Sequence, residues 1–150
     1  MKRERASVVC VHANQLLTVV LRDPATQQAR LFVPGGAIEP NETPADAAVR
    51  ETLEETGYRV HILPRAPVVA QYPYTWMGQR FDVTTHFFAT ALVDPAADAA
   101  PVTDASYLEG TCWLPLADVT KALAFDRIIL AAVQRLIPAA AAAGMARPSD

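Results

Sequence analysis

The chain has 150 residues, of which 51% are apolar, and it carries a formal net charge of −3 with an isoelectric point near 5.6. That length predicts one domain whose core buries roughly 68–70% of the surface of the unfolded chain. The charge balance argues against a protein that holds nucleic acid by its phosphates, and no uninterrupted run reaches the ~18 apolar residues of a membrane span.

The two cysteines, Cys10 and Cys112, lie far apart in apolar, strand-like stretches and form no CxxC pair. This spacing predicts reduced core thiols in an intracellular protein. The N-terminus has basic residues followed by apolar ones, as a signal peptide does. However, His12 and Asn14 interrupt the apolar stretch early, and no small-residue cleavage site follows it. A cytoplasmic location is therefore the expectation.

Strands precede and follow one central helix in the predicted order of elements. The predicted strands are 6–13, 15–22, 30–33, 58–63, 68–72, 79–93 and 111–114, and two further helices are predicted at 115–123 and 126–137. Polar loops are expected at 23–29 and 94–104. This pattern predicts a single α/β domain of the mixed α+β type at residues 1–138. Pro138 is expected to end the last helix, and the Ala-rich tail 139–150 is expected to be disordered.

The central helix is predicted to begin at Thr43 and to end at Gly57. The threonine hydroxyl can cap the helix, Pro44 is tolerated in the first turn, and Asp46 faces the positive end of the helix dipole. Gly57 supplies the left-handed residue that ends a helix. Helical spacing predicts a buried face formed by Ala45, Val49 and Leu53.

Three glutamates, Glu51, Glu54 and Glu55, share an arc of about 100° on this helix, opposite the predicted buried face. A solvated face is the ordinary interpretation of such an arc, but it would interleave lysine, and here only Arg50 is available. Two carboxylates ~5 Å apart at an effective dielectric of ~20 repel by about 3 kcal/mol. A hard divalent cation removes that cost, and Mg²⁺ selects clustered carboxylate oxygens. The spacing alone leaves a metal cradle and a solvated face equally open.

The residues around these glutamates match a known motif. Gly36, Glu42, Arg50-Glu51, Glu54-Glu55, Gly57 and Tyr58 have the spacing of the Nudix box, so residues 36–58 resemble the Nudix hydrolases. The order of elements on either side also resembles that fold, in which a mixed β-sheet is sandwiched between α-helices. Thr52 departs from the family pattern, which usually has a bulky aliphatic residue there. Because Thr52 lies at the edge of the predicted buried arc, a small packing change is expected.

The resemblance implies a set of metal ligands and a supporting ion pair. Glu51, Glu54 and Glu55 correspond to the metal-binding glutamates of the box, and the Gly35 carbonyl to a backbone ligand. Arg50 and Glu42 correspond to the pair that orients the catalytic helix. The implied cofactor is Mg²⁺, with Mn²⁺ as a substitute. The implied reaction is hydrolysis within the pyrophosphate of a nucleoside diphosphate linked to another group X.

The reaction needs a general base for the attacking water. The resemblance implies catalytic roles for Glu51 and Glu54 within the box. It also implies Glu109, which lies before the Trp-containing strand, where family members often carry a base. An ordinary loop acid is an equally good interpretation of Glu109.

The nature of X depends on the segment around Tyr74 and Trp76, whose aromatic rings could stack on a base. Packing within a hairpin is the plainer interpretation. A proline and a tyrosine downstream of the box mark ADP-ribose hydrolases and dinucleoside polyphosphate hydrolases, respectively, and this chain has both Pro73 and Tyr74. The C-terminal phrase LAFDRIILAAV resembles endings of short ADP-ribose pyrophosphatases, which favours an ADP-ribose-like substrate.

Other functions remain as alternatives. One is a dinucleoside polyphosphate or nucleoside triphosphate pyrophosphohydrolase. Another, from a different class, is a non-catalytic nucleotide-sensing domain, although this box keeps every charged position. The expected partner is a small-molecule nucleotide, with no membrane and, from the net charge, no nucleic acid. A homodimer is one assembly that the sequence leaves open.

Overall fold

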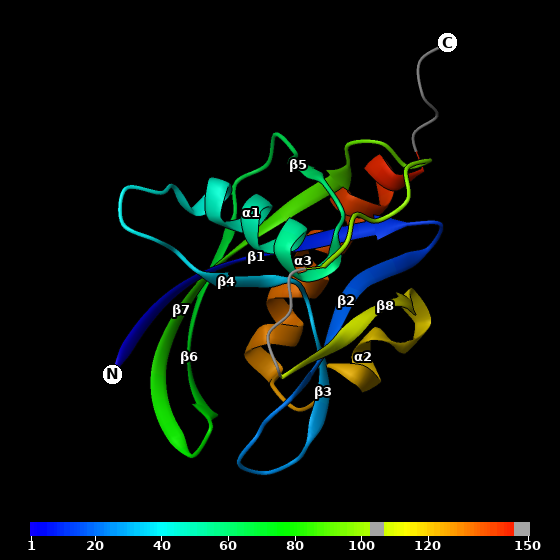
Figure 1. Ribbon diagram of the computed structural model, residues 1–150. Coiled ribbons are helices and arrows are strands. Elements are labelled where there is room, and N and C mark those ends of the chain that lie inside the picture. Colours follow the sequence, from blue (N-terminus) through cyan, green and yellow to red (C-terminus); the bar gives the residue numbers. More distant parts are fainter. Residues whose placement is uncertain (103–106, 146–150) are drawn as a thin grey trace.

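An eight-stranded mixed sheet forms the centre of the molecule in the computed structural model, which describes residues 1–102 and 107–145 (Figure 1). Its main path runs β3–β2–β1–β7–β5, while β4 pairs with β1, β6 with β7, and β8 with β2. The strands are β1 (Lys2–His12), β2 (Gln15–Arg22), β3 (Ala29–Phe32), β4 (Gly35–Ala37), β5 (Val60–Ile62), β6 (Val68–Trp76), β7 (Gln79–Leu92) and β8 (Leu108–Pro115).

The long strand β1 is the axis of this sheet. It runs parallel to β7, antiparallel to β4, and turns into β2 at its C-terminal end. The turn residues Ala13 and Asn14 have φ angles of 49° and 63°. Positive φ at both central residues is the geometry that suits the twist of a two-residue hairpin. The predicted hairpin is thus confirmed, although β1 begins at Lys2 and not at Ala6.

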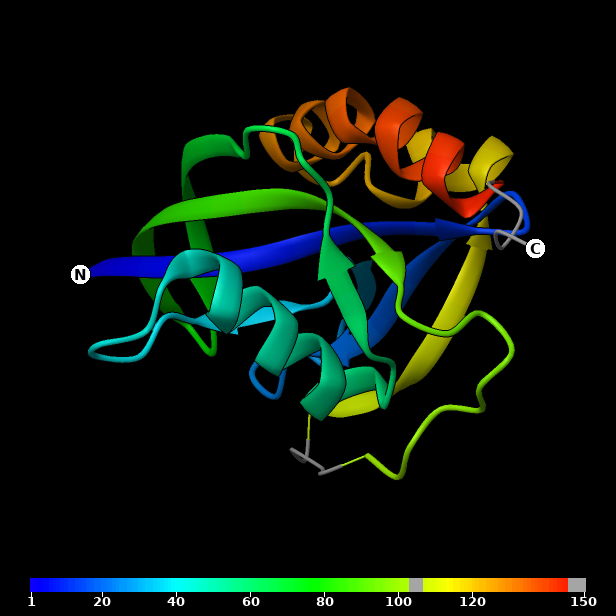
Figure 2. The same cartoon turned by 90° about the horizontal axis from the view of Figure 1, so that it is seen from above.

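Helices cover both faces of the sheet, with α1 (Pro44–Thr56) on one side and α3 (Arg127–Gly144) on the other (Figure 2). A short segment, η1 (Leu116–Asp118) followed by α2 (Val119–Ala122), precedes α3. Alternate residues of β1 serve the two cores: Val8 and Cys10 pack with α1, and Val9 and Val11 pack with α3. The predicted mixed sheet between helices is confirmed.

Both cysteines are free, but only one is fully buried. Cys10 has no exposed surface, and its burial raises the pKa of its thiol to about 12. Cys112 on β8 is half-buried. The prediction of a core thiol therefore holds for Cys10 alone.

The last helix is longer than predicted. α3 continues through Pro138 to Gly144, so the predicted end at Pro138 is wrong. A proline inside a helix removes one backbone hydrogen bond and costs about 3 kcal/mol, but the segment after it makes tertiary contacts. Ala140 is fully buried, and Gly144 lies so close to the Val11 carbonyl that a Cβ there would collide with it. Residues 146–150 of the predicted tail lie outside the described residues.

By length and composition α3 could also cross a membrane. Its Ile129, Val133 and Leu136 are buried against the sheet, as in the core helix of a globular domain. The packing of this apolar stripe accounts for part of its hydropathy, since 28% of the helix is buried.

Candidate active site

Helix α1 is fixed at both of its ends. The Thr43 hydroxyl accepts a hydrogen bond from the Asp46 amide at 3.1 Å. Gly57 has a φ of 75°, and its amide donates to the Leu53 carbonyl at 2.9 Å. Both predicted caps are confirmed. Because the caps satisfy terminal backbone groups, they also fix where the helix starts and hence which way each side chain points.

The buried face of α1 differs from the predicted one. Ala45, Val49 and Leu53 are only half-buried. The buried residues are Ala47, Ala48, Thr52 and Thr56. The arc that these four residues define contains both Glu51 and Glu55, so the prediction that the acidic face lies opposite the core is wrong for these two residues. Only Glu54 of the three glutamates is exposed.

The small buried side chains on α1 include two threonines with internal partners. The Thr52 hydroxyl donates to the Ala48 carbonyl at 2.8 Å, and the Thr56 hydroxyl donates to the Thr52 carbonyl at 2.6 Å. A hydroxyl bonded back to the preceding turn satisfies itself within the helix. Thr52 is fully buried, so it lies within the buried face of α1 and not at the edge where it was expected.

The Glu55 carboxylate points toward the strand that precedes the helix. It accepts a hydrogen bond from the Gly35 amide at 2.8 Å. Burial raises the pKa of Glu55 to about 7, although the Gly35 amide and the positive charge of Arg5 oppose the rise. The carboxylates of Glu51 and Glu54 add to it. The carboxylates of the three glutamates are thus close enough to interact electrostatically.

Arg50 lies among the acids of the box. Its Nε donates to Glu42 at 2.7 Å, one Nη donates to Glu51 at 2.9 Å and to Glu54 at 3.3 Å, and the other donates to the Ala37 carbonyl at 3.1 Å. The hydrogen bond from Arg50, together with one from the Glu39 amide, lowers the pKa of Glu42 to about 2. The ion pair between Arg50 and Glu42 that the resemblance implied is present.

Glu51 packs against the strand β4. Its carboxylate lies so close to Gly36 that a Cβ at residue 36 would collide with it. Burial raises the pKa of Glu51, and the hydrogen bond from Arg50 opposes the rise. Gly36 thus provides the space in which one box carboxylate sits beside the backbone of β4.

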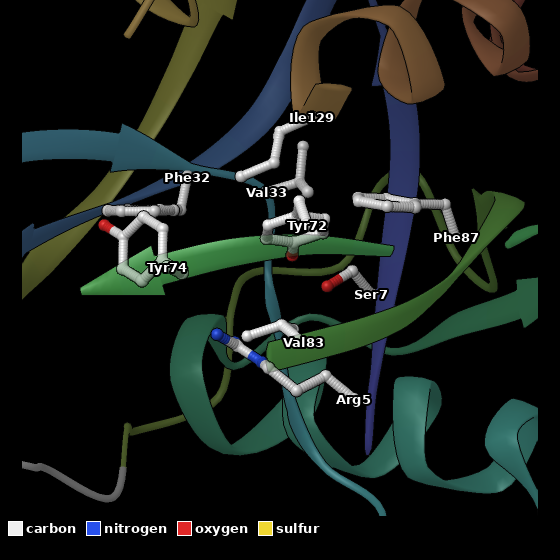
Figure 3. Close-up of a pocket in the computed structure, with 9 residues that line it drawn as sticks. All are labelled: Arg5, Ser7, Phe32, Val33, Tyr72, Tyr74, Val83, Phe87 and Ile129. Carbon is white, nitrogen blue, oxygen red and sulfur yellow. The ribbon is translucent and has the colours of Figure 1, made fainter. Parts of the chain in front are cut away.

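Glu51 and Glu55 line a cleft of about 430 Å³ whose other lining residues come mostly from strands. Its other charged lining residues are Arg3 and Arg5 of β1. Its aromatic lining residues are Phe32, Tyr74, Trp76, Phe81 and Tyr107. A smaller recess adjoins it, and shares Arg5, Phe32, Tyr74 and Val83 with it (Figure 3). The cleft therefore combines carboxylates, arginines and an aromatic wall.

Tyr74 and Trp76, the residues predicted to contact substrate, both lie in this cleft. Tyr74 packs edge-on against Phe32 with ring centroids 5.9 Å apart, and Trp76 packs against Tyr107 at 5.6 Å. Burial raises the pKa of the Tyr74 hydroxyl. The two rings take part in packing and still border the open volume, so the two interpretations of this segment are compatible.

Glu109 lies elsewhere. Its carboxylate forms an ion pair with Arg22, and it is not among the residues that line the cleft with Glu51 and Glu55. The structure thus brings Glu51 and Glu55 together in the cleft, whereas Glu54 is exposed on α1 and Glu109 is paired with Arg22.

The NUDIX domain family model matches residues 1–133. The chain belongs to the NUDIX family.

Similar proteins include several NUDIX hydrolases. The diphosphoinositol polyphosphate phosphohydrolase 3-beta of Bos taurus is 39% identical over 57 residues, which are 38% of this chain and 35% of that protein. The match thus spans about a third of the length of this curated relative.

Solved structures share the fold over nearly the whole chain. A NUDIX hydrolase from Nitrosomonas europaea superposes with a TM-score of 0.60 at 23% identity, covering 95% of this chain and 90% of that one. An Ap4A hydrolase complex from C. elegans superposes with a TM-score of 0.64 at 19% identity, covering 93% and 98%. At these identities the likeness supports the fold and nothing finer.

NUDIX proteins typically use a divalent metal ion, and the residues of this site fit one. The donors are all oxygens, namely the carboxylates of Glu51, Glu54 and Glu55 and the Gly35 carbonyl, and hard cations prefer such donors. In the described part of the chain no three acidic, histidine or cysteine side chains already converge as a metal site. Arg50 donates to one oxygen of Glu51 and, at 3.3 Å, to Glu54, and this hydrogen bond leaves the second carboxylate oxygen of Glu51 available to an ion.

The sequence-based prediction omitted part of the NUDIX cleft. Arg3 and Arg5 line it because they are alternate residues of β1 and point to the same face of the sheet. The alternate positions of Arg3 and Arg5 in the sequence could have been used to predict that both side chains lie on one face of the sheet. No sequence pattern indicated Phe32 or Tyr107, because the strand and loop that bring them to the cleft are positioned by the tertiary fold.

Proposed function

We propose that this NUDIX protein is a Mg²⁺-dependent hydrolase of a nucleoside diphosphate linked to X, with an ADP-ribose-like compound as its favoured substrate. One observation carries the proposal: the Glu51 and Glu55 carboxylates and the aromatic pair Tyr74 and Trp76 line the same cleft. Its volume, about 430 Å³, lies within the range of roughly 300–1,000 Å³ that is usual for small-molecule sites. A nucleotide offers both a pyrophosphate for the acidic end and a base for the aromatic wall.

Each residue of the site has a proposed role. Glu51, Glu54, Glu55 and the Gly35 carbonyl hold the ion, and Arg50, anchored by Glu42, orients α1. When bound, Mg²⁺ (or Mn²⁺) would neutralise phosphate charge and acidify a coordinated water. Glu54 is the proposed general base, because it lies on α1 beside the other box acids and its hydrogen bonds from Arg50 are long, at 3.3 and 3.4 Å, whereas Glu109 forms a close ion pair with Arg22. Tyr74 and Trp76 bind the base of the nucleotide.

Three other substrate classes remain to be tested against this one. A dinucleoside polyphosphate also has a base for the aromatic wall, and an Ap4A hydrolase shares the fold. A nucleoside triphosphate would also fit the acidic end. A diphosphoinositol polyphosphate, the substrate class in the name of the bovine relative, has many phosphates and no base. The cleft is lined by two arginines and several aromatic rings, which favours a nucleotide.

The deciding experiment is a substrate panel with Mg²⁺ that measures released AMP or phosphate. It includes ADP-ribose, diadenosine tetraphosphate, a nucleoside triphosphate and a diphosphoinositol polyphosphate. We expect the highest kcat/KM for ADP-ribose. Preference for the inositol compound would contradict the nucleotide proposal. Tight nucleotide binding without turnover of any compound would identify a sensor.

Variants of α1 test the assigned roles. Glu54→Gln should lower kcat roughly 10²–10⁴-fold, as expected for loss of a general base. Glu55→Gln should also lower turnover and raise the Mg²⁺ concentration needed for half-maximal rate. Asp46→Asn is the matched control, because it removes one negative charge from the exposed first turn of the same helix. Near-normal rates in both glutamine variants would refute the assignment.

A further inference from the structure

Arg5 is a cation inside the cleft that has no fixed partner among the described residues. It lies on β1, paired through its backbone with Ala37 of β4 and Thr85 of β7, and its side chain is half-buried. Figure 3 shows this side chain passing Val83 with its guanidinium on the side of Tyr74. No ion pair or hydrogen bond of this guanidinium is found in the described parts of the chain. A half-buried arginine usually has such a partner, because its five donors lose water on burial.

The other two arginines near the site are already engaged. Arg50 binds Glu42, Glu51, Glu54 and the Ala37 carbonyl. Arg3 lies over the Phe81 ring, 4.3 Å from its centroid. The ring contact of Arg3 leaves its N–H donors free, but Arg3 is exposed to water. Among these three cations, Arg5 is the half-buried one that has no hydrogen-bond partner in the described residues.

Arg5 also has a distinctive place between the two ends of the cleft. Its neighbours among the lining residues are Glu51 and Glu55 at the acidic end and Tyr72 and Tyr74 at the aromatic end. It lines both the main cleft and the recess beside Tyr74. A ligand whose base touches the aromatic wall and whose phosphates reach the carboxylates would pass Arg5.

The charge balance of the cleft supports an anionic ligand at this point. The two lining arginines offset the two lining carboxylates, Glu51 and Glu55. Counted over these four lining residues, a divalent cation held by the carboxylates would leave an excess of two positive charges, which would balance the two negative charges of a pyrophosphate esterified at both ends. The guanidinium fork matches phosphate oxygens in geometry as well as in charge.

We propose that Arg5 is a phosphate-binding residue that holds the substrate between the metal-holding carboxylates and the aromatic wall. This inference rests on the proposed nucleotide hydrolase function and names a residue that determines how the diphosphate lies in the cleft.

The test compares binding of two probes by calorimetry in the presence of Mg²⁺: α,β-methylene-ADP, which keeps the diphosphate but resists cleavage within it, and adenosine, which has no phosphate. Arg5→Gln should weaken α,β-methylene-ADP binding roughly 10–100-fold, the value of a charge-assisted hydrogen bond, and leave adenosine binding unchanged. Arg5→Lys keeps the charge but loses the fork, so it should recover part of the affinity. Arg135→Gln, which removes the same charge from an exposed position of α3, is the control.

The outcomes separate this inference from the proposed function. If the unaltered protein fails to bind α,β-methylene-ADP, the nucleotide function itself is contradicted. If it binds and Arg5→Gln binds equally well, or if both probes weaken together, the role of Arg5 is wrong while the function stands. Thermal unfolding checks that the variants are folded. Should Arg5→Gln not fold, Arg5→Lys alone decides, because unchanged α,β-methylene-ADP affinity in that variant contradicts a guanidinium contact.

Discussion

The Glu55 carboxylate lies in the buried arc of α1, where apolar residues would be expected. Three features make this position tolerable: the amide of Gly35 donates to it, the charge of Arg5 reaches it, and its pKa rises to about 7 so that it can take up a proton. A buried acid without a cation is unfavourable in its charged form. The charged form of Glu55 is therefore unfavourable without a metal ion, and a bound ion would remove that free-energy cost. An acid in such a perturbed environment is typical of a functional position.

Stability should therefore depend on pH through Glu55 in the metal-free protein. The folded-state pKa of about 7 exceeds the ordinary value of 4.5, so the stabilising contribution of this group is complete below pH 4.5 and is lost as the pH rises through 7. Between pH 5 and pH 8 the free energy of unfolding should fall by about 2–3 kcal/mol more in the unaltered protein than in Glu55→Gln. Glutamine is the chosen replacement because its side-chain carbonyl can still accept the hydrogen bond from the Gly35 amide.

Urea unfolding with EDTA at the two pH values measures this difference. Charges other than Glu55 titrate in both proteins and cancel to first order. An identical pH dependence for the two proteins would show that Glu55 ionises normally. Addition of Mg²⁺ at pH 8 should stabilise the unaltered protein more than the variant, because the ion binds only the folded state.

At the scale of elements, the C-terminal end of α1 is held by a neighbouring loop. Gly57 has a φ of 75°, and its carbonyl accepts a hydrogen bond from the Ala100 amide at 2.8 Å. A Cβ at residue 57 would collide with the Ala100 carbonyl. The glycine is therefore required twice, once for its backbone conformation and once for the space beside it.

Gly57→Ala should consequently cost more than an ordinary glycine replacement in the left-handed region. Gly78, in the turn between β6 and β7, is the matched control because it has the same φ of 75° but no heavy atom within 4 Å of a Cβ. Gly78→Ala should cost about 1 kcal/mol, and Gly57→Ala a further ~1–3 kcal/mol for the collision. If chemical denaturation gave equal losses in the free energy of unfolding for the two variants, the loop that contains Ala100 would move aside without cost.

The C-terminal half of α3 offers a second test at this scale. Ala140 is fully buried while Ala142 is exposed, and both follow Pro138. Ala140→Leu should destabilise the protein by about 1–3 kcal/mol through overpacking, and Ala142→Leu should leave stability within about 0.5 kcal/mol. Equal midpoints of thermal unfolding in the two variants would mean that the segment after Pro138 does not pack on the sheet.

The sequence was most informative where local rules decide the structure. Thr43 and Gly57 marked the ends of α1 because capping depends on neighbouring residues alone. Runs of apolar and β-branched residues marked β1 and β2, and alternation marked β7. The buried face of α1 was predicted wrongly because hydrophobicity favoured Val49 and Leu53, whereas small residues such as Ala48 and Thr52 let the helix approach the sheet. Pro138 was predicted to end the last helix because the sequence shows that a proline costs one backbone hydrogen bond. The sequence does not show that the residues after Pro138 pack against β1 and offset this cost.

In the candidate site, too, the sequence predicted what depends on local spacing and missed what depends on tertiary contacts. The box glutamates and the pair of Arg50 with Glu42 follow from fixed spacing along one helix and the loop before it. The position of Glu109 could not be predicted, because its partner Arg22 is distant in the chain and the two residues meet only through the pairing of β2 with β8. Arg5 had the same limitation, since it meets the box only through the pairing of β1 with β4.

At the scale of the whole molecule, β1 joins the two cores. Val8 and Cys10 face the core beneath α1, and Val9 and Val11 face the core beneath α3. A strand that belongs to both cores cannot leave one without disturbing the other, since its residues alternate between the two faces. The layer that carries the box glutamates is therefore coupled to the layer formed by α3.

Unfolding should accordingly be a single cooperative transition, and the two tryptophans can report on the two cores separately. Trp113 packs against the core beneath α1, and Trp76 packs against the core beneath α3. In Trp76→Phe the remaining fluorescence follows the first core, and in Trp113→Phe it follows the second. For each variant the fluorescence midpoint in urea should coincide with the midpoint of its own far-UV circular dichroism. If Trp113 fluorescence changed at lower urea than the dichroism, α1 would unfold as a separate unit, and binding of a metal ion by its glutamates would then stabilise that helix without stabilising the rest of the protein.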